Sequence, residues 1–125
     1  MSDFRLTPWK PKIREKDVVE ACIDYLNVRG YACVRVPTGR YRTLDGKRFV
    51  TFGAPGIPDY VAIHSRYPGF FIEFKRPEGG RLSEVQKRKL HELIEAHRLA
   101  ATVCASVEDL VTWLAAHEAR SGRGP

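Results

Sequence analysis

The segment FFIEFK, residues 70–75, reads as a buried β-strand but carries two charged residues, Glu73 and Lys75. Residues two apart in a strand share one face, so this carboxylate and this ammonium project together with Phe71. The three remaining side chains of the segment pack on the opposite side. An unpaired charge in so apolar a segment carries a large free-energy cost, so we expect the pair to serve a chemical purpose.

A second carboxylate, that of Asp59, is expected to lie beside this pair. A polar turn at 65–69 joins the strand that begins at Asp59 to the strand that ends at Lys75, and hairpin register sets Asp59 roughly opposite Glu73 to Lys75. Hard carboxylate oxygens suit Mg²⁺ or Mn²⁺, ions that keep water in their shell. Such an ion lowers the pKa of its water, and a lysine beside it stabilises negative charge on a phosphoryl oxygen.

The simplest alternative is an ion pair on a half-exposed sheet face, because Glu-x-Lys spacings are common. The surrounding sequence favours chemistry, since GIPD precedes one strand at 56–59 and LSEVQ opens the next helix at 82–86. The amide of Gln86 both donates and accepts, so it could hydrogen-bond the attacking water, the Lys75 amine or a phosphate. Its ordinary interpretation is a solvated residue in the first turn of a helix.

These residues resemble the signature of the PD-(D/E)XK nuclease superfamily, and more narrowly its VRR-NUC family, whose stand-alone forms occur among phage and bacterial proteins. Pro58-Asp59, Glu73-Phe74-Lys75 and Gln86 match the motif, and the resemblance runs from about Arg14 to Leu114. It implies a restriction-endonuclease-like αβββαβ core with a mixed central sheet flanked by helices. It also implies Mg²⁺-dependent hydrolysis of DNA phosphodiester bonds, with Mn²⁺ as a substitute, and often a preference for branched DNA such as Holliday junctions or flaps.

The family usually adds an acidic residue from its first helix, for which this chain offers Glu15 and Glu20. Glu15 precedes Val19, Cys22 and Leu26 at helical spacing, which predicts an inward position on the apolar stripe. We therefore expect Glu15 to join Asp59 and Glu73 as a metal ligand and catalytic residue, with Glu20 as the alternative. The ordinary interpretation of Glu15 is a helix N-terminal residue favoured by the dipole.

Basic residues lie on both sides of these motifs in the sequence, and the chain carries a net charge of +6. Tyr41 and Phe49 interleave with the first set, which favours phosphate tracking and base stacking. Each set alone is also typical of a solvated surface. The residues expected to bind nucleic acid are Arg35, Arg40, Arg42, Lys47 and Arg48 in the first set, and Arg76, Arg81 and Lys87 in the second.

Hydrophobic periodicity predicts the elements that must position these residues. Helices are expected at 13–29, 82–98 and 107–120, the last two capped by Ser83 and Ser106. Strands are expected at 31–37, 59–64, 69–75 and 99–106, with a hairpin or long loop at 38–56 that turns at Asp45-Gly46. This order predicts an α/β domain with a mixed sheet, an antiparallel central meander and a last strand reached through a helical crossover.

The chain of 125 residues suits one domain, expected at 12–118, with an N-terminal arm at 1–11 and a flexible tail at 119–125. Cys22, Cys33 and Cys104 are expected to be reduced core thiols, and the four histidines to pack or face solvent. No apolar run is long enough for a membrane span or a signal core, so we expect a cytoplasmic protein. We also expect no small-molecule cofactor.

Three functions fit the sequence. The first is a Mg²⁺-dependent endonuclease, acting as a homodimer if it cuts both strands of a symmetric junction. The second is a non-catalytic nucleic-acid-binding module with the same fold, whose carboxylates serve structure alone. The third is an accessory subunit whose loop TFGAPG, residues 51–56, docks a protein partner. The complete set of acidic residues and lysine favours the first.

Overall fold

The computed structural model describes residues 12–121, so the expected N-terminal arm and the last four residues lie outside the described part of the chain. These residues form three α-helices, one π-helix and six strands. The helices are α1 (Glu15–Val28), α2 (Glu84–His91), the π-helix η1 (Glu92–Ala96) and α3 (Val107–Arg120). The strands are β1 (Ala32–Arg35), β2 (Gly39–Arg42), β3 (Phe49–Phe52), β4 (Tyr60–Ile63), β5 (Phe70–Phe74) and β6 (Ala100–Cys104).

Four strands form one mixed sheet in the order β1-β4-β5-β6. β1, β4 and β5 pair antiparallel, whereas β6 pairs parallel with β5 and is reached through α2 and η1. The α/β class, the antiparallel meander and the helical crossover are therefore as predicted. The segment at 38–56 forms a hairpin, because β2 and β3 pair with each other in a separate two-stranded sheet.

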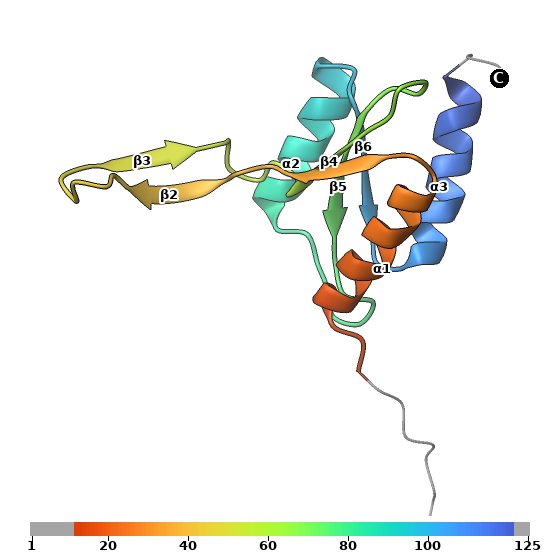
Figure 1. Cartoon of the computed structure of the whole chain (residues 1–125), viewed down its shortest axis with the longest axis horizontal. Coiled ribbons are helices and arrows are strands. Elements are labelled where there is room, and N and C mark those ends of the chain that lie inside the picture. The colour runs from red at the N-terminus through yellow and green to blue at the C-terminus, as the bar shows by residue number, and fades with distance from the viewer. Residues whose placement is uncertain (1–11, 122–125) are drawn as a thin grey trace, which may run out of the picture.

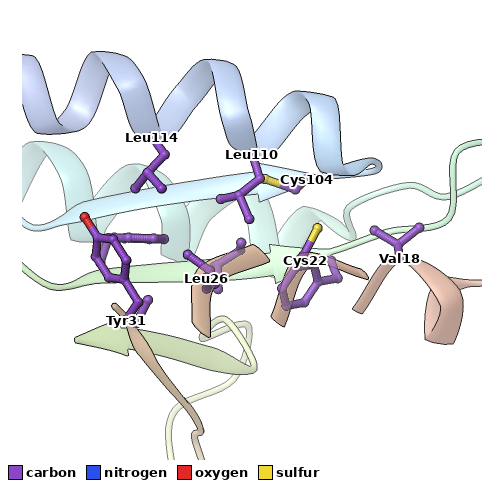
Figure 2. Packing of buried hydrophobic residues seen from close by; sticks show 11 residues of the cluster. Val18, Cys22, Leu26, Tyr31, Cys104, Leu110 and Leu114 are labelled. Atoms are coloured by element: carbon purple, nitrogen blue, oxygen red, sulfur yellow. The ribbon is translucent and has the colours of Figure 1, made fainter. Parts of the chain in front are cut away.

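The sheet lies between helices on both faces, with α1 and α3 on one side and α2 on the other (Figure 1). The main core fills the space between the sheet and the first two of these helices. In Figure 2, Cys22 and Leu26 of α1 approach Leu110 and Leu114 of α3 across Cys104 of β6. Leu26 and Leu110 are fully buried, so truncating either side chain to alanine is expected to cost about 2–5 kcal/mol.

α1 forms because its apolar residues recur at helical spacing. Val18, Cys22 and Leu26 are four residues apart, and all three are buried against the sheet. The helix ends at Val28, and Gly30 follows with a φ of +87°, which favours glycine; the Tyr31 N–H then donates to the Leu26 carbonyl at 2.9 Å. This packing places the first turn of α1 beside the start of β4 and the last residue of β5.

β5 is the most buried strand, as its composition predicts. Phe70, Ile72 and Phe74 all face the core between the sheet and α1 and α3, with exposed fractions of 3% or less. Glu73 alternates with them and therefore points to the other face, toward α2. Although charged, Glu73 is also buried, because the N-terminus of α2 covers this end of the strand.

The second helix differs from its prediction. α2 gives way to the π-helix η1, which ends at Ala96. Beyond it, Arg98 has a φ of +56°, and the Leu99 N–H donates to the Leu93 carbonyl. A π-helical turn holds an extra residue and so rotates the apolar stripe. Leu93 stays buried, whereas the neighbouring Ile94 is 41% exposed.

α3 continues through Arg120, so Ala119 and Arg120, assigned to the flexible tail by the domain prediction, are helical. Ser106 caps the helix as predicted, with its hydroxyl accepting from the Asp109 N–H at 3.1 Å. His117 is a packing residue: it is buried, its Nε2 lies 2.8 Å from the Pro68 carbonyl, and its ring stacks on Trp113.

All three cysteines are free, as expected. Burial raises the pKa of the Cys22 thiol to about 12 and the pKa values of Cys33 and Cys104 to about 11. A thiol that resists ionisation is a poor nucleophile and a poor metal ligand. Within residues 12–121, no helix has the length and apolar character needed to cross a membrane.

Candidate active site

The two carboxylates meet where β4 begins and β5 ends. Tyr60 pairs with Ile72 across the two strands, which sets Asp59, one residue before β4, opposite Glu73. The Asp59 N–H donates to Oε2 of Glu73 at 3.2 Å. The predicted hairpin register is therefore confirmed, and it brings together residues that are separated by 14 positions in the chain.

Glu73 is held by three donors although it is only 3% exposed. Besides the Asp59 N–H, the amide Nε2 of Gln86 donates to Oε1 at 2.8 Å, and the Lys75 ammonium lies 3.5 Å from the same oxygen. Burial raises the pKa of Glu73, and the neighbouring charge of Asp59 raises this pKa further. The Asp59 N–H and Lys75 act in the opposite direction, because both stabilise the ionised carboxylate.

Gln86 connects the start of α2 to this carboxylate. Ser83 caps the helix as predicted, accepting from the Gln86 N–H at 3.1 Å, while Oε1 of Gln86 accepts from the Ser83 N–H at 2.9 Å. The same side chain then has its amide nitrogen free to donate to Glu73. The sequence suggested water, Lys75 or phosphate as its partner, but in the structure Gln86 positions Glu73.

An open cleft of about 740 Å³ begins at these residues. Asp59, Lys75 and Gln86 line it together with Arg81, the loop 53–57 and the base of the β2–β3 hairpin. Within the described residues 12–121, the Asp59 carboxylate has no hydrogen bond or salt bridge. The cleft therefore contains an uncompensated carboxylate beside a lysine and an amide, and it is open to solvent rather than enclosed.

Glu15 lies near this site but not at the inward position that was expected. It is exposed, because the first turn of α1 precedes the part of the helix that packs on the sheet. Glu15 borders two smaller hollows, one shared with Lys75 and the other shared with Asp59. Glu20 borders the second hollow as well, and its carboxylate lies 3.8 Å from Lys16. The two candidate acids of α1, Glu15 and Glu20, thus face the same side of the candidate site.

The part of the chain that the structure describes contains no group of three or more His, Cys, Asp or Glu side chains placed to hold a metal ion. Asp59 and Glu73 thus stand as a pair, and Glu15 lies apart from them. Mg²⁺ is commonly held in proteins by one or two carboxylates and retains several waters, so a pair of this kind is a sufficient ligand set for that ion.

The predicted nucleic-acid-binding residues divide into three groups. Arg35, Arg76 and Arg81 line the hollows around the site. Lys87 lies apart from them on the exposed side of α2, where its ammonium is 3.3 Å from Glu84. The remaining four are carried by the hairpin, beyond the cleft: Arg40, Arg42, Lys47 and Arg48.

Sequence reasoning did not assign a role in the site to the loop 53–57, which forms one wall of the cleft. Gly56 in this loop has a φ of +79°, and a Cβ there would lie 2.5 Å from the Val85 carbonyl oxygen. Only glycine allows the loop to approach the first turn of α2 this closely. The Gly-Ala-Pro-Gly sequence was the available signal, since such residues mark a sharp turn.

Comparison with known proteins finds no match: no protein-family model, no curated protein and no solved structure matches this chain.

Proposed function

We propose that this protein is a metal-dependent DNA endonuclease that hydrolyses phosphodiester bonds and selects branched DNA. The observation that carries the proposal is the convergence of Asp59, Lys75 and Gln86 on one cleft beside a basic hairpin, with the buried Glu73 in contact with all three. Residues of this type, in this order along the chain, are those of the PD-(D/E)XK signature. The order α1, β1, β4, β5, α2, β6 likewise supports a restriction-endonuclease-like core of the VRR-NUC kind.

The two carboxylates fit Mg²⁺, with Mn²⁺ as a substitute. The Asp59 carboxylate has no partner among the described residues, and Glu73 has a raised pKa caused first by burial and then by the Asp59 charge. Asp59 and Glu73 would hold a divalent cation, whose charge would stabilise the ionised form of both carboxylates; Oε2 of Glu73 keeps a lone pair beyond the one that accepts from the Asp59 N–H. When bound, the ion supplies an acidified water and charge stabilisation on a phosphoryl oxygen.

The chain's own residues then have distinct roles. Lys75, 3.5 Å from Glu73 and facing the cleft, orients the nucleophile and stabilises negative charge on the phosphate. Gln86 holds Glu73 in its ionised form through a bond to the carboxylate. Glu15, at the border of two adjoining hollows, helps to arrange a water or a second ion. Arg81, which lines the same cleft, contacts the phosphates that flank the scissile bond.

One domain presents one such site, so cutting both strands of a symmetric junction requires a two-fold homodimer. The proposed place of action is the cytoplasm. A second candidate function is a non-catalytic nucleic-acid-binding module with a nuclease-like fold. The observation in its favour is that Glu73 is buried and already accepts hydrogen bonds from the Asp59 N–H and the Gln86 amide, so its carboxylate also serves the structure. Metal dependence separates the two functions.

The test incubates the purified protein with labelled four-way junction, flap, single-stranded and linear duplex DNA in Mg²⁺, Mn²⁺ or EDTA. The proposal expects metal-dependent cuts that are lost in Asp59→Ala and in Lys75→Ala but kept in Glu84→Ala. Glu84 is a matched control because it is an exposed carboxylate outside the cleft. Binding of junction DNA without cleavage under any metal would instead establish the binding module.

A second measurement follows the metal directly. Mg²⁺ that binds only the folded protein stabilises it by about 2.7 kcal/mol at a concentration of 100 times the dissociation constant. The thermal midpoint of the wild type and of Glu84→Ala is therefore expected to rise with Mg²⁺, and the midpoint of Asp59→Ala is expected to stay unchanged. Equal shifts in all three proteins would place the ion elsewhere.

A further inference from the structure

The β2–β3 hairpin has a role of its own beyond general attraction of DNA. Its strands pair only with each other, and Figure 1 shows the hairpin projecting away from the four-stranded sheet. The base of the hairpin, at Thr38, Gly39 and Thr51, lines the cleft that holds Asp59 and Lys75. The hairpin therefore connects the candidate active site to a point well outside the body of the domain.

The tip of the hairpin presents one apolar side chain on an ordered turn. Leu44 is fully exposed, at 109% of its reference area. Around it, the Thr43 N–H donates to the Arg48 carbonyl at 2.9 Å and the Gly46 N–H donates to the Thr43 carbonyl at 2.8 Å. The turn is thus closed by its own hydrogen bonds, and Leu44 makes no contribution to the core.

The single carboxylate of the hairpin is engaged inside this turn. Asp45 accepts from the Thr43 hydroxyl at 2.5 Å and from the Lys47 N–H at 3.0 Å, and these two bonds lower its pKa. Four cationic side chains of the hairpin remain directed to solvent: Arg40, Arg42, Lys47 and Arg48. A leucine surrounded by cations is poorly suited to an apolar protein pocket, but it suits a surface of phosphates with stacked bases beneath.

One face of the hairpin carries positive charge from the tip toward the cleft. Arg42 pairs with Phe49 and Arg40 pairs with Thr51, and opposite residues of an antiparallel pair share a face. The guanidinium carbons of Arg40 and Arg42 lie 4.3 and 5.1 Å from the centroid of the Phe49 ring, which holds both side chains in place. Thr51, on the same face, reaches the cleft.

We propose that Leu44 is a wedge that inserts between stacked bases at a branch point or duplex end, while the Arg40–Arg42 face holds the phosphates between that point and the cleft. Apolar wedges of this kind partly unstack base steps, which is least costly where stacking is already interrupted. The inference rests on the proposed nuclease function and names the feature of the substrate that the protein recognises.

The hairpin then sets the distance between the branch and the cut. Thr38 lines the cleft and Leu44 follows six residues later, and at about 3.3 Å per residue this span is about 20 Å. Since successive phosphates of one strand are about 3.4 Å apart along the helix axis, the span corresponds to about six nucleotides. Cuts are therefore expected about six nucleotides from the branch point.

The first test measures unstacking without cleavage. Four-way junction DNA carrying 2-aminopurine at the branch is mixed with the Asp59→Ala protein, and the fluorescence is expected to rise because the probe brightens when it unstacks. The double variant Asp59→Ala, Leu44→Ala is expected to bind the junction without this rise, whereas Leu44→Met in the same background restores it. An equal rise with and without Leu44, or no rise although the junction is bound, overturns the wedge.

The second test uses the active protein and maps its cuts. Inserting two residues into each strand, after Arg42 and before Phe49, keeps the alternation of faces and lengthens the hairpin by about 7 Å. The cut is expected to move by about two nucleotides away from the branch. A wild type that unstacks the junction but never cuts it refutes the proposed nuclease and leaves the wedge standing. Cutting at an unchanged position in the lengthened protein refutes the wedge alone.

Discussion

Replacing Gln86 by alanine is expected to change the pH dependence of cleavage as well as its rate. The Gln86 amide donates to a buried carboxylate at 2.8 Å, and hydrogen bonds to charged groups are worth about 1.5–3 kcal/mol. Losing the bond destabilises the ionised form of Glu73 more than the protonated form, which accepts the same N–H more weakly, so the ratio of ionised to protonated carboxylate falls by a factor of at most roughly 10 to 150. The pKa of Glu73, already raised by burial, then rises further.

On the proposed function, Mg²⁺ needs the ionised carboxylate, so cleavage is expected to be lost as pH falls through the pKa of Glu73, and Gln86→Ala is expected to move this loss to higher pH. Cleavage rates measured across pH at saturating Mg²⁺ report the change, and ¹³C resonance of labelled glutamate follows Glu73 itself in the metal-free protein. Ser83→Ala is the matched control. It removes the other side chain of the same helix cap, at about 1 kcal/mol, without touching Glu73.

Gln86→Ala should therefore displace both titrations, while Ser83→Ala should lower stability and displace neither. If the two variants lose stability equally and show the wild-type pH profile, Gln86 is only a capping residue and the positioning role is wrong. Rescue by Gln86→Asn is not expected, because the shorter side chain cannot reach both Ser83 and the carboxylate. A uniform loss of rate at every pH would also contradict the reasoning.

Three further outcomes test the fold and the site. The pKa of Glu73 is raised above its ordinary value of 4.5, partly by the charge of Asp59. Glu73 therefore holds its proton to higher pH in the folded than in the unfolded state, and the free energy of unfolding falls as pH rises from 4.5 through the folded-state pKa. In urea denaturation, Asp59→Asn should be more stable than the wild type above this pH range, by on the order of 1 kcal/mol, and should lose the gain below it. Leu110→Ala, at a fully buried position, should cost about 2–5 kcal/mol in the same assay, whereas its neighbour Val111, which is 40% exposed, should tolerate alanine with little change. Gly56→Ala should lower the free energy of unfolding by more than the roughly 1–2 kcal/mol expected for a left-handed backbone position, because its Cβ would lie 2.5 Å from a carbonyl oxygen of α2. The thermal midpoint measures this loss. An unchanged midpoint with full cleavage would show that the loop adjusts.

The parts of the molecule that follow from local signals were predictable. Alternation and a short polar turn set the register of Asp59 against Glu73, and a serine before an apolar helical pattern located both helix caps. The class of the fold follows from the same signals, because the order of helices and strands leaves few ways to build one sheet.

The remaining parts depend on packing between distant segments. The inward position expected for Glu15 was wrong because periodicity gives a direction around the helix but not where along its length the sheet begins. The contact between Gln86 and Glu73 requires the start of α2 to approach the end of β5, and that approach depends on Gly56. The π-helix at 92–96 has no local sequence signal of its own.

The isolation of the hairpin has an evolutionary consequence. Since β2 and β3 share no strand pairing with the four-stranded sheet, substitutions and insertions there leave the main core unaffected and are tolerated as long as the two strands still pair. If the hairpin selects the substrate and the cleft cleaves it, as proposed, selection can act on the two almost independently within one short chain. Relatives of this protein should keep the residues around Glu73 and differ most in the hairpin, with lengths that change by even numbers of residues per strand, because odd changes would turn its basic face away from the cleft.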